Sequence, residues 1–475
     1  MIRIVCTLII VPIFSATAQQ NEDAKRINQA VFNKIEYHFN LQETDSIYAL
    51  TGATFRQSLS LQAFQTVMSQ QLYPLGQIQS AELKSYEKGI GIYKLNFLST
   101  PLQVVLELDR LNKVETLLFQ PYAGDPTSDK PSDPPVKAQT FDRYVDSVAL
   151  SYSRKKHTHA LAVGIINAGK TSSYYYGETE KGNRSLPDEN TLFEIGSITK
   201  TFTATLLAYL DQTQQLRLSD IITQYLPDSV AKNADLQHIT LLQLANHTSG
   251  MPRMPANIGK TSASHPQDPY AGYTRKDLYE YLTSYKAAVP PDSLYIYSNI
   301  GFGLLGDILT TVSGKSYDEM VQEFICKPLG LKNTTERPDQ SSQQVAKVYD
   351  EKGVETPIWT FDAFSAHGSL KSTVPDLIAY AKAHFKMPET DLEHALALTR
   401  QFTYFNPPDT DIGLAWHMNL MGDELVYWHN GGTFGSRSYM AFTPDKKIAV
   451  VVLSNTAESV DAIGASIMRK ILDSQ

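Results

Sequence analysis

A proline-rich stretch in the first third of the chain limits what the sequence can fold into. Residues 122–139 read YAGDPTSDKPSDPPVKAQ, where four prolines stand among small and charged residues. Proline has no N–H to donate, so it disrupts helices and sheets. The stretch also contains too few apolar side chains to form a core. We therefore expect a linker here, with one domain over residues 19–121 and another over residues 140–475. A length of 475 residues also favours two domains.

The chain begins with a segment typical of secretory signal peptides. Arg3 is followed by an apolar run, and Ala16-Thr17-Ala18 supplies the small residues of a cleavage site. An apolar run of about 11 residues is too short for a membrane span, which needs about 20. We therefore predict that residues 1–18 are a signal peptide and that the protein is exported, to the periplasm or outside the cell. Only Cys326 would then remain, so we expect no internal disulfide.

The region between the signal and the linker predicts a small α+β domain. Apolar residues recur along a helical stretch over residues 21–40, at Ile27, Val31, Ile35 and Phe39. A second helical stretch covers residues 61–72. Four strand-like runs follow it, at residues 77–86, 90–98, 102–109 and 114–119. This order of elements resembles nuclear-transport-factor-2-like domains. It contains no catalytic constellation.

The region after the linker has strands at both of its ends. A helix over residues 141–156 precedes a hairpin whose strands cover residues 160–166 and 171–176. Three further strands lie near the C-terminus, at residues 425–429, 437–442 and 448–453. Helices and loops fill the sequence between them. This pattern predicts one antiparallel sheet that is closed by both ends of the domain, with a helical insertion.

One of four Ser-x-x-Lys segments has an unusual setting. The copy at Ser85 lies in the first domain. The copy at Ser153 lies in a basic helix end, and the copy at Ser229 follows a Leu-Pro-Asp turn. Ser197 instead opens a helical stretch in which Lys200 is the only charged residue over residues 195–210. A buried lysine has a lowered pKa, and position i+3 places its amine beside the serine. Such a pair can activate a serine nucleophile; the alternative is an N-cap serine with a snorkelling lysine.

Two further short patterns follow Ser197 along the chain. Tyr297 and Asn299 form Tyr-x-Asn before an apolar helix, although Tyr404-Phe405-Asn406 is a second copy. An apolar strand then delivers His429, with Gly431 and Gly432 behind it. Glycines at the end of a strand allow a ligand to approach the backbone closely.

Together these patterns resemble the signature set of the penicillin-binding-protein and class C β-lactamase superfamily of serine hydrolases. The resemblance covers residues 141–472 and includes LLQLANHTSGMP at residues 241–252, PLGL at residues 328–331 and GLAW at residues 413–416. It implies an α/β fold of the β-lactamase/transpeptidase-like type. An antiparallel sheet flanked by helices would face a helical lobe, with the site between them.

The resemblance also implies a role for each residue. Ser197 would attack a carbonyl and become acylated, while Lys200 and Tyr297 would share the work of the general base. Asn299 would bind a substrate amide, and His429 would lie opposite on the edge strand. The backbone N–H groups of Ser197 and Gly432 would form an oxyanion hole. Gly431 belongs to the same substrate-binding segment.

The sequence leaves the substrate open. Class C β-lactamases usually carry lysine where His429 stands, and histidine is more like D-amino-acid peptidases and esterases. A histidine with an ordinary pKa near 6.5 would supply a titrating cation for a substrate carboxylate. We expect an enzyme acting on a small amide, ester, D-amino-acid peptide or β-lactam; the alternative is a binding or regulatory module with little turnover.

Composition argues against several other partners. The net charge of −8 leaves no basic surplus for nucleic acid. We expect no stable membrane span and no cofactor. His157-Thr158-His159 lacks neighbouring cysteines or carboxylates, so we expect no metal site there.

Overall fold

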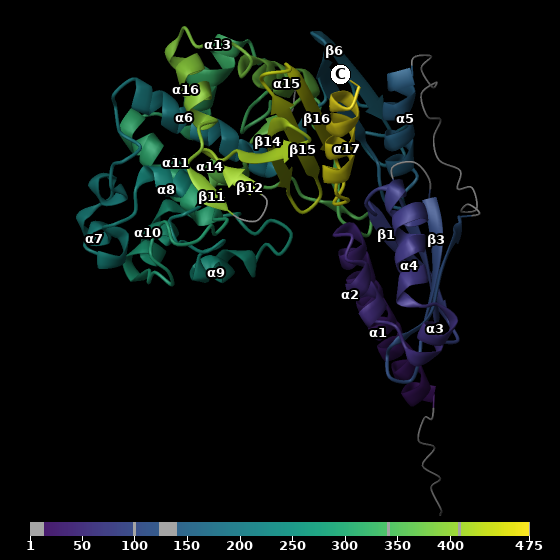
Figure 1. Cartoon of the computed structure of the whole chain (residues 1–475). Coiled ribbons are helices and arrows are strands. Elements are labelled where there is room, and N and C mark those ends of the chain that lie inside the picture. Colours follow the sequence, from purple (N-terminus) through teal and green to yellow (C-terminus); the bar gives the residue numbers. More distant parts are fainter. Residues whose placement is uncertain (1–13, 98–100, 123–139, 340–342, 407–409, 475) are drawn as a thin grey trace, which may run out of the picture. The chain divides into compact units, whose positions relative to one another are not determined.

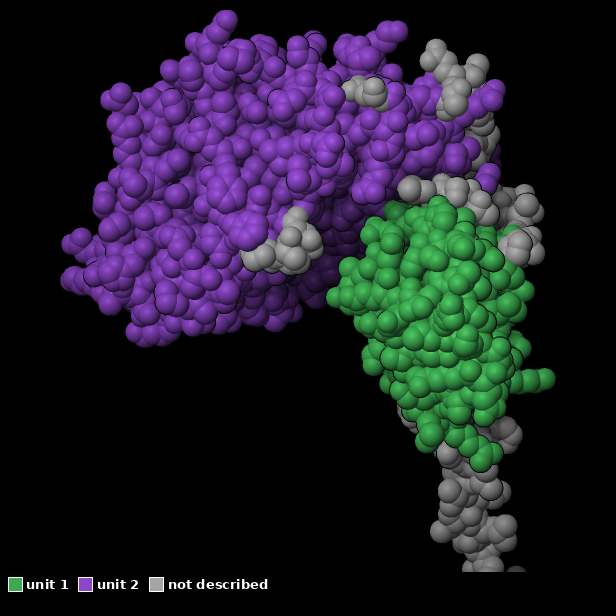
Figure 2. All heavy atoms as spheres, viewed as in Figure 1, with its two compact units in different colours: residues 1–129 green, residues 130–475 purple. Residues whose placement is uncertain are grey.

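A computed structural model describes residues 14–97, 101–122, 140–339, 343–406 and 410–474. The chain divides into two compact units, residues 1–129 and residues 130–475 (Figure 2). The predicted linker lies outside the described residues apart from Tyr122, and so do the first 13 residues of the predicted signal peptide. Within the described part, no helix is both long enough and apolar enough to cross a bilayer.

Unit 1 packs helices against one face of a four-stranded antiparallel sheet, as predicted. The helices are α1 (Phe14–Asn40), α2 (Thr44–Ala49), α3 (Ala53–Ser58) and α4 (Leu61–Val67), which continues as a π-helical turn over Met68–Leu72. The strands are β1 (Ser80–Glu87), β2 (Ile90–Asn96), β3 (Pro101–Leu108) and β4 (Val114–Pro121), paired in that order.

The buried face of α1 differs from the predicted stripe. Ile27 is exposed, whereas Asn28 and Phe32 are buried together with the expected Ile35 and Phe39. Phe32 stacks on Tyr93 with ring centroids 3.8 Å apart. Asn28 fits this face because its amide is fully used: it accepts from Tyr93 Oη at 2.7 Å and donates to the Leu106 carbonyl at 3.1 Å. A buried polar group with partners on both atoms replaces the apolar residue that the pattern predicted.

Unit 2 is built on an eight-stranded antiparallel sheet of order β11-β12-β13-β14-β15-β16-β5-β6 (Figure 1). The N-terminal hairpin of the domain therefore pairs with its last strand, as predicted. The strands of this sheet are β5 (Leu161–Asn167), β6 (Lys170–Tyr176), β11 (Tyr404–Asn406), β12 (Thr410–Ile412), β13 (His417–Met421), β14 (Glu424–Gly432), β15 (Arg437–Thr443) and β16 (Ile448–Ser454). The second Tyr-x-Asn copy is thus edge strand β11.

Helices cover both faces of this sheet and form the lobe beside it. They are α5 (Thr140–Ser153), α6 (Thr199–Gln212), α7 (Asp228–Ala231), α8 (Leu241–Ala245), α9 (Gly259–Ser262), α10 (Arg275–Ser284), α11 (Asn299–Ser313), α12 (Tyr317–Met320), α13 (Lys327–Leu329), α14 (Ser365–Gly368), α15 (Val374–Ala383), α16 (Asp391–Thr399) and α17 (Asp461–Leu472). Two pairs of two-residue strands stand apart from this sheet: β7 (Phe193–Glu194) pairs with β10 (Lys371–Ser372), and β8 (Val348–Tyr349) pairs with β9 (Glu355–Thr356).

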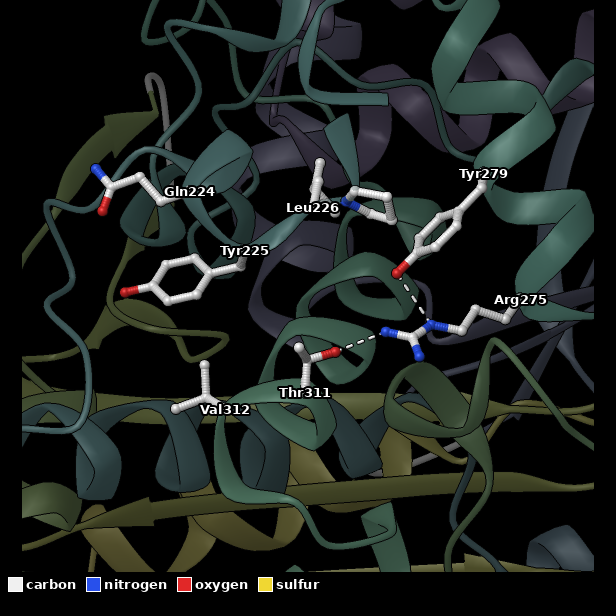
Figure 3. A pocket seen from close by; sticks show the side chains of 8 residues that line it. Gln224, Tyr225, Leu226, Arg275, Tyr279, Thr311 and Val312 are labelled. Atoms are coloured by element: carbon white, nitrogen blue, oxygen red, sulfur yellow. Dashed lines mark hydrogen bonds between the residues drawn. The ribbon is translucent and has the colours of Figure 1, made fainter. Parts of the chain in front are cut away.

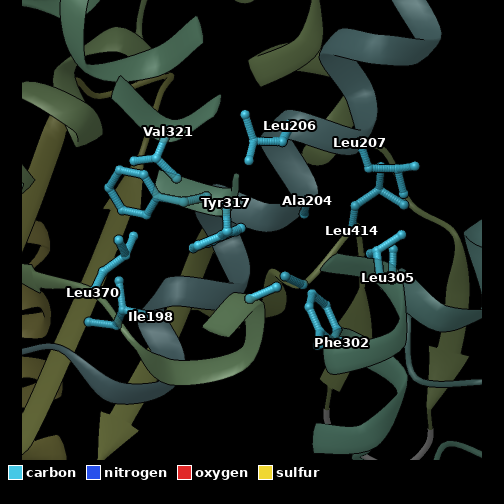
Figure 4. Packing of buried hydrophobic residues seen from close by; sticks show 14 of the residues in the cluster. Ile198, Ala204, Leu206, Leu207, Phe302, Leu305, Tyr317, Val321, Leu370 and Leu414 are labelled. Atoms are coloured by element: carbon cyan, nitrogen blue, oxygen red, sulfur yellow. The ribbon is translucent and has the colours of Figure 1, made fainter. Parts of the chain in front are cut away.

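The two faces of the sheet have separate hydrophobic cores. Alternate residues of β16 point to opposite faces: Val450 and Val452 pack with α5 and α17, while Val451 and Leu453 pack with α6, α11 and α15. Because both faces are covered, this strand is apolar throughout. The second core surrounds α6, whose Leu206 and Leu207 belong to the same buried cluster as Phe302 and Leu305 of α11 (Figure 4). The helix that carries Lys200 is therefore held by packing on nearly all sides.

Candidate active site

Ser197 and Lys200 lie together at the start of α6. Ser197 stands in a 3₁₀ turn over Gly196–Ile198, and it is only partly buried among buried neighbours. Lys200 is fully buried in the first turn of α6. Its Nζ is 3.0 Å from Ser197 Oγ and donates to the His367 carbonyl at 2.8 Å. The i, i+3 spacing thus gives the proximity that the sequence predicted.

The surroundings of Lys200 favour its neutral form. Burial lowers the pKa of Lys200 well below its usual 10.5, and the positive charge of Arg253 lowers it further. Lys200 Nζ also lies 4.9 Å from the centroid of the Tyr297 ring. A neutral amine beside a serine hydroxyl has a free lone pair for the serine proton.

Glycines allow the nucleophile turn to lie directly against β14. Gly196 has φ +49°, and a Cβ on it would lie 2.6 Å from Gly432 N. A Cβ on Gly431 would lie 2.9 Å from Ser197 N. Side chains at these positions would push the two segments apart. The backbone N–H groups of Ser197 and Gly432 therefore belong to one small region beside Ser197 Oγ.

The end of β14 has an open edge next to Ser197. Pairing of β14 with β13 ends at Trp428, opposite His417, whereas pairing with β15 continues to Gly432. Within the described residues, no strand therefore pairs with residues 429–432 on the β13 side. An extended substrate can lie along such an edge.

Tyr297 lies between the buried amine of Lys200 and the guanidinium of Arg253. Its hydroxyl is hydrogen-bonded to Ser197, and burial raises its pKa above the usual 10 despite that bond and the charge of Arg253. The Arg253 guanidinium lies 5.0 Å from the ring centroid, a cation–π distance. Tyr297 therefore stays a neutral phenol at physiological pH, able to pass a proton on.

Asn299 has one satisfied and one free amide atom. Its Nδ2 donates to Tyr270 Oη at 3.0 Å, and Tyr270 Oη in turn contacts Met254 Sδ at 3.3 Å. Its Oδ1 is buried and has no hydrogen-bond partner among the described residues. A buried acceptor without a partner is costly and calls for a ligand. The Tyr270 bond orients Asn299 so that Oδ1 can receive an N–H group.

His429 is fully buried, which opposes the cation that the sequence predicted here. Burial holds its pKa well below 6.5, and the charges of His417 and Lys200 lower it further. Its Nδ1 lies 2.5 Å from the Asn430 carbonyl, which can only accept, so Nδ1 carries the proton. Its Nε2 is then an acceptor, buried and without a partner in the protein. An unprotonated Nε2 does not attract a carboxylate, but it can accept a hydrogen bond.

The HTSG segment fixes the loop that carries Tyr297. His247 Nδ1 accepts from Ser298 N at 3.0 Å, and its carbonyl accepts from Ile296 N at 2.8 Å. Its ring lies 4.4 Å from the Tyr297 ring. Thr248 Oγ1 donates to Asp292 at 2.7 Å. His247 therefore fixes the residues immediately before and after Tyr297, which are Ile296 and Ser298.

Comparison with known proteins identifies the family. The family model described as Beta-lactamase matches residues 138–471. The chain belongs to the Beta-lactamase family. A beta-lactamase of Pseudomonas fluorescens is 30% identical over 69% of this chain and 98% of its own length. The D-alanyl-D-alanine-carboxypeptidase/endopeptidase AmpH of Escherichia coli K12 is 28% identical over 68% of this chain and 85% of its own length.

Solved structures agree with this assignment to the Beta-lactamase family. A class C beta-lactamase has a TM-score of 0.62 and 26% identity, covering 70% of this chain and 95% of the other. The beta-lactamase/D-alanine carboxypeptidase of Pseudomonas syringae has the same fold, with a TM-score of 0.63, 23% identity and coverage of 70% and 99%. The predicted superfamily and fold are confirmed, and the protein is a serine hydrolase.

A second hollow in this Beta-lactamase family member offers no comparable chemistry. It is a cavity of about 460 Å³ in the helical lobe, lined by Tyr225, Arg275, Tyr279, Thr311 and neighbouring residues (Figure 3). Arg275 donates to Tyr279 and Thr311 and pairs with Asp307. Its polar groups thus satisfy one another. The region around Ser197 differs because buried Asn299 Oδ1 and His429 Nε2 are left open.

Proposed function

We propose that the protein forms an acyl-enzyme at Ser197. The observation that carries the proposal is the 3.0 Å contact between Ser197 Oγ and a buried lysine whose pKa is lowered. Ser197 Oγ attacks the substrate carbonyl carbon while its proton passes to Lys200 Nζ. The carbonyl π electrons move to oxygen, giving an oxyanion next to the N–H groups of Ser197 and Gly432.

Collapse of this intermediate expels the leaving group. Tyr297, as a neutral phenol bonded to Ser197, donates a proton to the departing atom and recovers one from the Lys200 ammonium. Water then attacks the acyl-enzyme by the reverse path, with Lys200 again taking the proton. The lowered pKa of Lys200 and the raised pKa of Tyr297 support this division of roles. His429 Nε2 accepts a hydrogen bond in this relay or from substrate.

The proposed substrates are small amides, esters, D-amino-acid peptides or β-lactams. Free Asn299 Oδ1 supports an amide N–H on the acyl side of the substrate. The open edge of β14 at Gly431 and Gly432 supports an extended segment on the other side. We further propose export through the signal at residues 1–18, with the domain boundary in residues 122–139; the N-terminal residue of the secreted chain tests the first.

Covalent labelling tests the acyl-enzyme. The protein is incubated with a fluorophosphonate or a slowly hydrolysed β-lactam, and the adduct is mapped by mass spectrometry. We expect the adduct on Ser197 and its loss in Ser197→Ala. Ser229→Ala is the matched control, since Ser229 begins another Ser-x-x-Lys but is exposed. Labelling elsewhere, or turnover that survives Ser197→Ala, overturns the proposal; labelling without turnover favours a binding module.

A further inference from the structure

Arg253 lies at the solvent side of the same site. Its side chain is exposed, while its guanidinium lies over the face of the Tyr297 ring. Lys200 lies over that ring as well but is fully buried. Since the Tyr297 hydroxyl bonds Ser197, a single ring separates the guanidinium from the nucleophile. A group attached near the reacting carbonyl can therefore reach Arg253.

The backbone around Arg253 is held in place. Its carbonyl accepts from Asn299 N at 3.0 Å, and the preceding Pro252 carbonyl accepts from Ser298 Oγ at 2.8 Å. The following Met254 contacts Asn299 Nδ2 and Tyr270 Oη through its sulfur. The backbone that carries the side chain is thus fixed next to Asn299, while the guanidinium is exposed to solvent over the Tyr297 ring.

The positive charge of Arg253 has no counter-ion in the part of the chain that the structure describes. Among the described residues no carboxylate forms an ion pair with it, whereas Arg275 in the same lobe pairs with Asp307. The groups whose positive charge would lower the pKa of Lys200, His247 and His367 are all basic, and Arg253 is common to the three. The site consequently carries an uncompensated positive potential next to Asn299.

We infer that Arg253 binds an anionic group, a carboxylate, on the acyl side of the substrate and so sets substrate preference. This inference rests on the proposed function, because it assumes acylation at Ser197. Arginine suits the task since its planar guanidinium binds carboxylates with two hydrogen bonds and stays charged at all relevant pH values. It fills the anion-binding role that neutral His429 cannot fill.

A pair of esters tests the inference. Mono-4-nitrophenyl adipate carries a free carboxylate on its acyl chain, and 4-nitrophenyl methyl adipate has the same chain with that group capped. The measured quantity is the ratio of kcat/KM for the anionic ester to kcat/KM for the neutral ester. We expect this ratio to fall about tenfold in Arg253→Met, as for loss of a charge-assisted hydrogen bond. Arg253→Lys should fall in between.

The ratio separates binding from chemistry. Loss of Arg253 also changes the pKa of Lys200, but both esters depend on Lys200, so that effect cancels. Arg217→Met removes an exposed arginine beyond the far end of α6 and should leave the ratio unchanged. Added salt should lower the ratio in the wild-type protein but not in Arg253→Met.

Each outcome decides something. An unchanged ratio in Arg253→Met, with turnover that depends on Ser197, overturns the role of Arg253 and leaves the proposed function intact. If neither ester is hydrolysed through Ser197, the proposed function fails and the inference fails with it. If Arg253→Met does not fold, Arg253→Lys and the salt series decide: a salt-independent ratio equal in both proteins contradicts the inference.

Discussion

Two buried lysines in unit 2 lie in regions of opposite character. Lys200, at the active site, contacts one backbone carbonyl and Ser197 Oγ. Lys371, on β10, is paired across the strands with Glu194 of β7. Its Nζ donates to the carbonyls of Ser369 at 2.9 Å and Glu336 at 3.2 Å. Both lysines thus have hydrogen-bond acceptors, and they differ in the charged groups around them.

The electrostatics of the two regions differ in the same way. Burial lowers the pKa of both lysines, but Glu194 and Glu336 oppose this at Lys371, whereas Arg253 adds to it at Lys200. Glu194 is itself buried and bonded to Trp359 N and Thr433 Oγ1. Burial alone therefore does not make a lysine a base. The pKa falls far enough for a neutral amine where no carboxylate offsets the effect of burial.

The largest difference should appear in the rate. We expect Lys200→Met to lower kcat/KM for a neutral ester about 10³-fold or more, because Ser197 and Lys200 act as one unit and loss of either removes most of its catalytic effect. Circular dichroism would verify that the variant is folded. Lys286→Met, which removes an exposed lysine paired with Asp235, is the control and should keep full activity. Activity within tenfold of wild type in Lys200→Met would assign the base to another group.

Lys371 should instead determine stability. Lys371→Met removes the positive charge that opposes the effect of burial on Glu194 and leaves the carbonyls of Ser369 and Glu336 without this donor, which we expect to lower the free energy of unfolding by about 1–3 kcal/mol. Chemical denaturation measures this. The double variant Lys371→Met with Glu194→Gln should regain part of the loss, because no buried charge is then unpaired. A loss below about 1 kcal/mol in the single variant would contradict the contrast with Lys200.

The pH dependence of stability offers a third test. Native Lys200 has a pKa well below 10.5, whereas in the unfolded chain it is ordinary. Between those two values the unfolded state binds more protons, so stability should rise with pH by up to about 1.4 kcal/mol per unit. Lys200→Met removes this contribution. Denaturation at several pH values should thus show a flatter curve for the variant, and identical slopes would argue against a neutral native Lys200.

The smallest effect on kcat/KM should come from the residue that orients the Asn299 amide. Tyr270→Phe removes the partner of Asn299 Nδ2 and frees the amide to turn. We expect kcat/KM for an amide substrate to fall about 3- to 10-fold, as for loss of one hydrogen bond. Tyr281→Phe, a half-buried tyrosine of α10, is the matched control. Equal losses in both variants would indicate a general packing effect.

Sequence patterns were sufficient where local periodicity decides structure. The alternating and apolar runs located β1 to β6 and β14 to β16 within a few residues, and the i, i+3 spacing placed Lys200 beside Ser197. Strands β11 to β13 were missed because they are short and partly exposed, so they lack an apolar pattern.

Other features depend on residues far apart in the sequence. Tyr270 meets Asn299, and Arg253 meets Tyr297, only because the HTSG segment binds the loop before α11. No spacing in the chain indicates these pairs. The charge of His429 was mispredicted for the same reason, since the groups that bury it come from separate segments. Asn28 shows that a paired polar residue can occupy a core position.

The closure of the sheet by both ends of unit 2 determines when this domain can fold. Ala160 N, just before β5, donates to Asn455 Oδ1, 295 positions later and just after β16. On a ribosome, β5 and β6 therefore wait for nearly the whole domain to be synthesised before their neighbour exists. Such distant pairing folds slowly. The chain consequently stays open until its last strand is made, and a truncation before β16 should leave no folded catalytic unit.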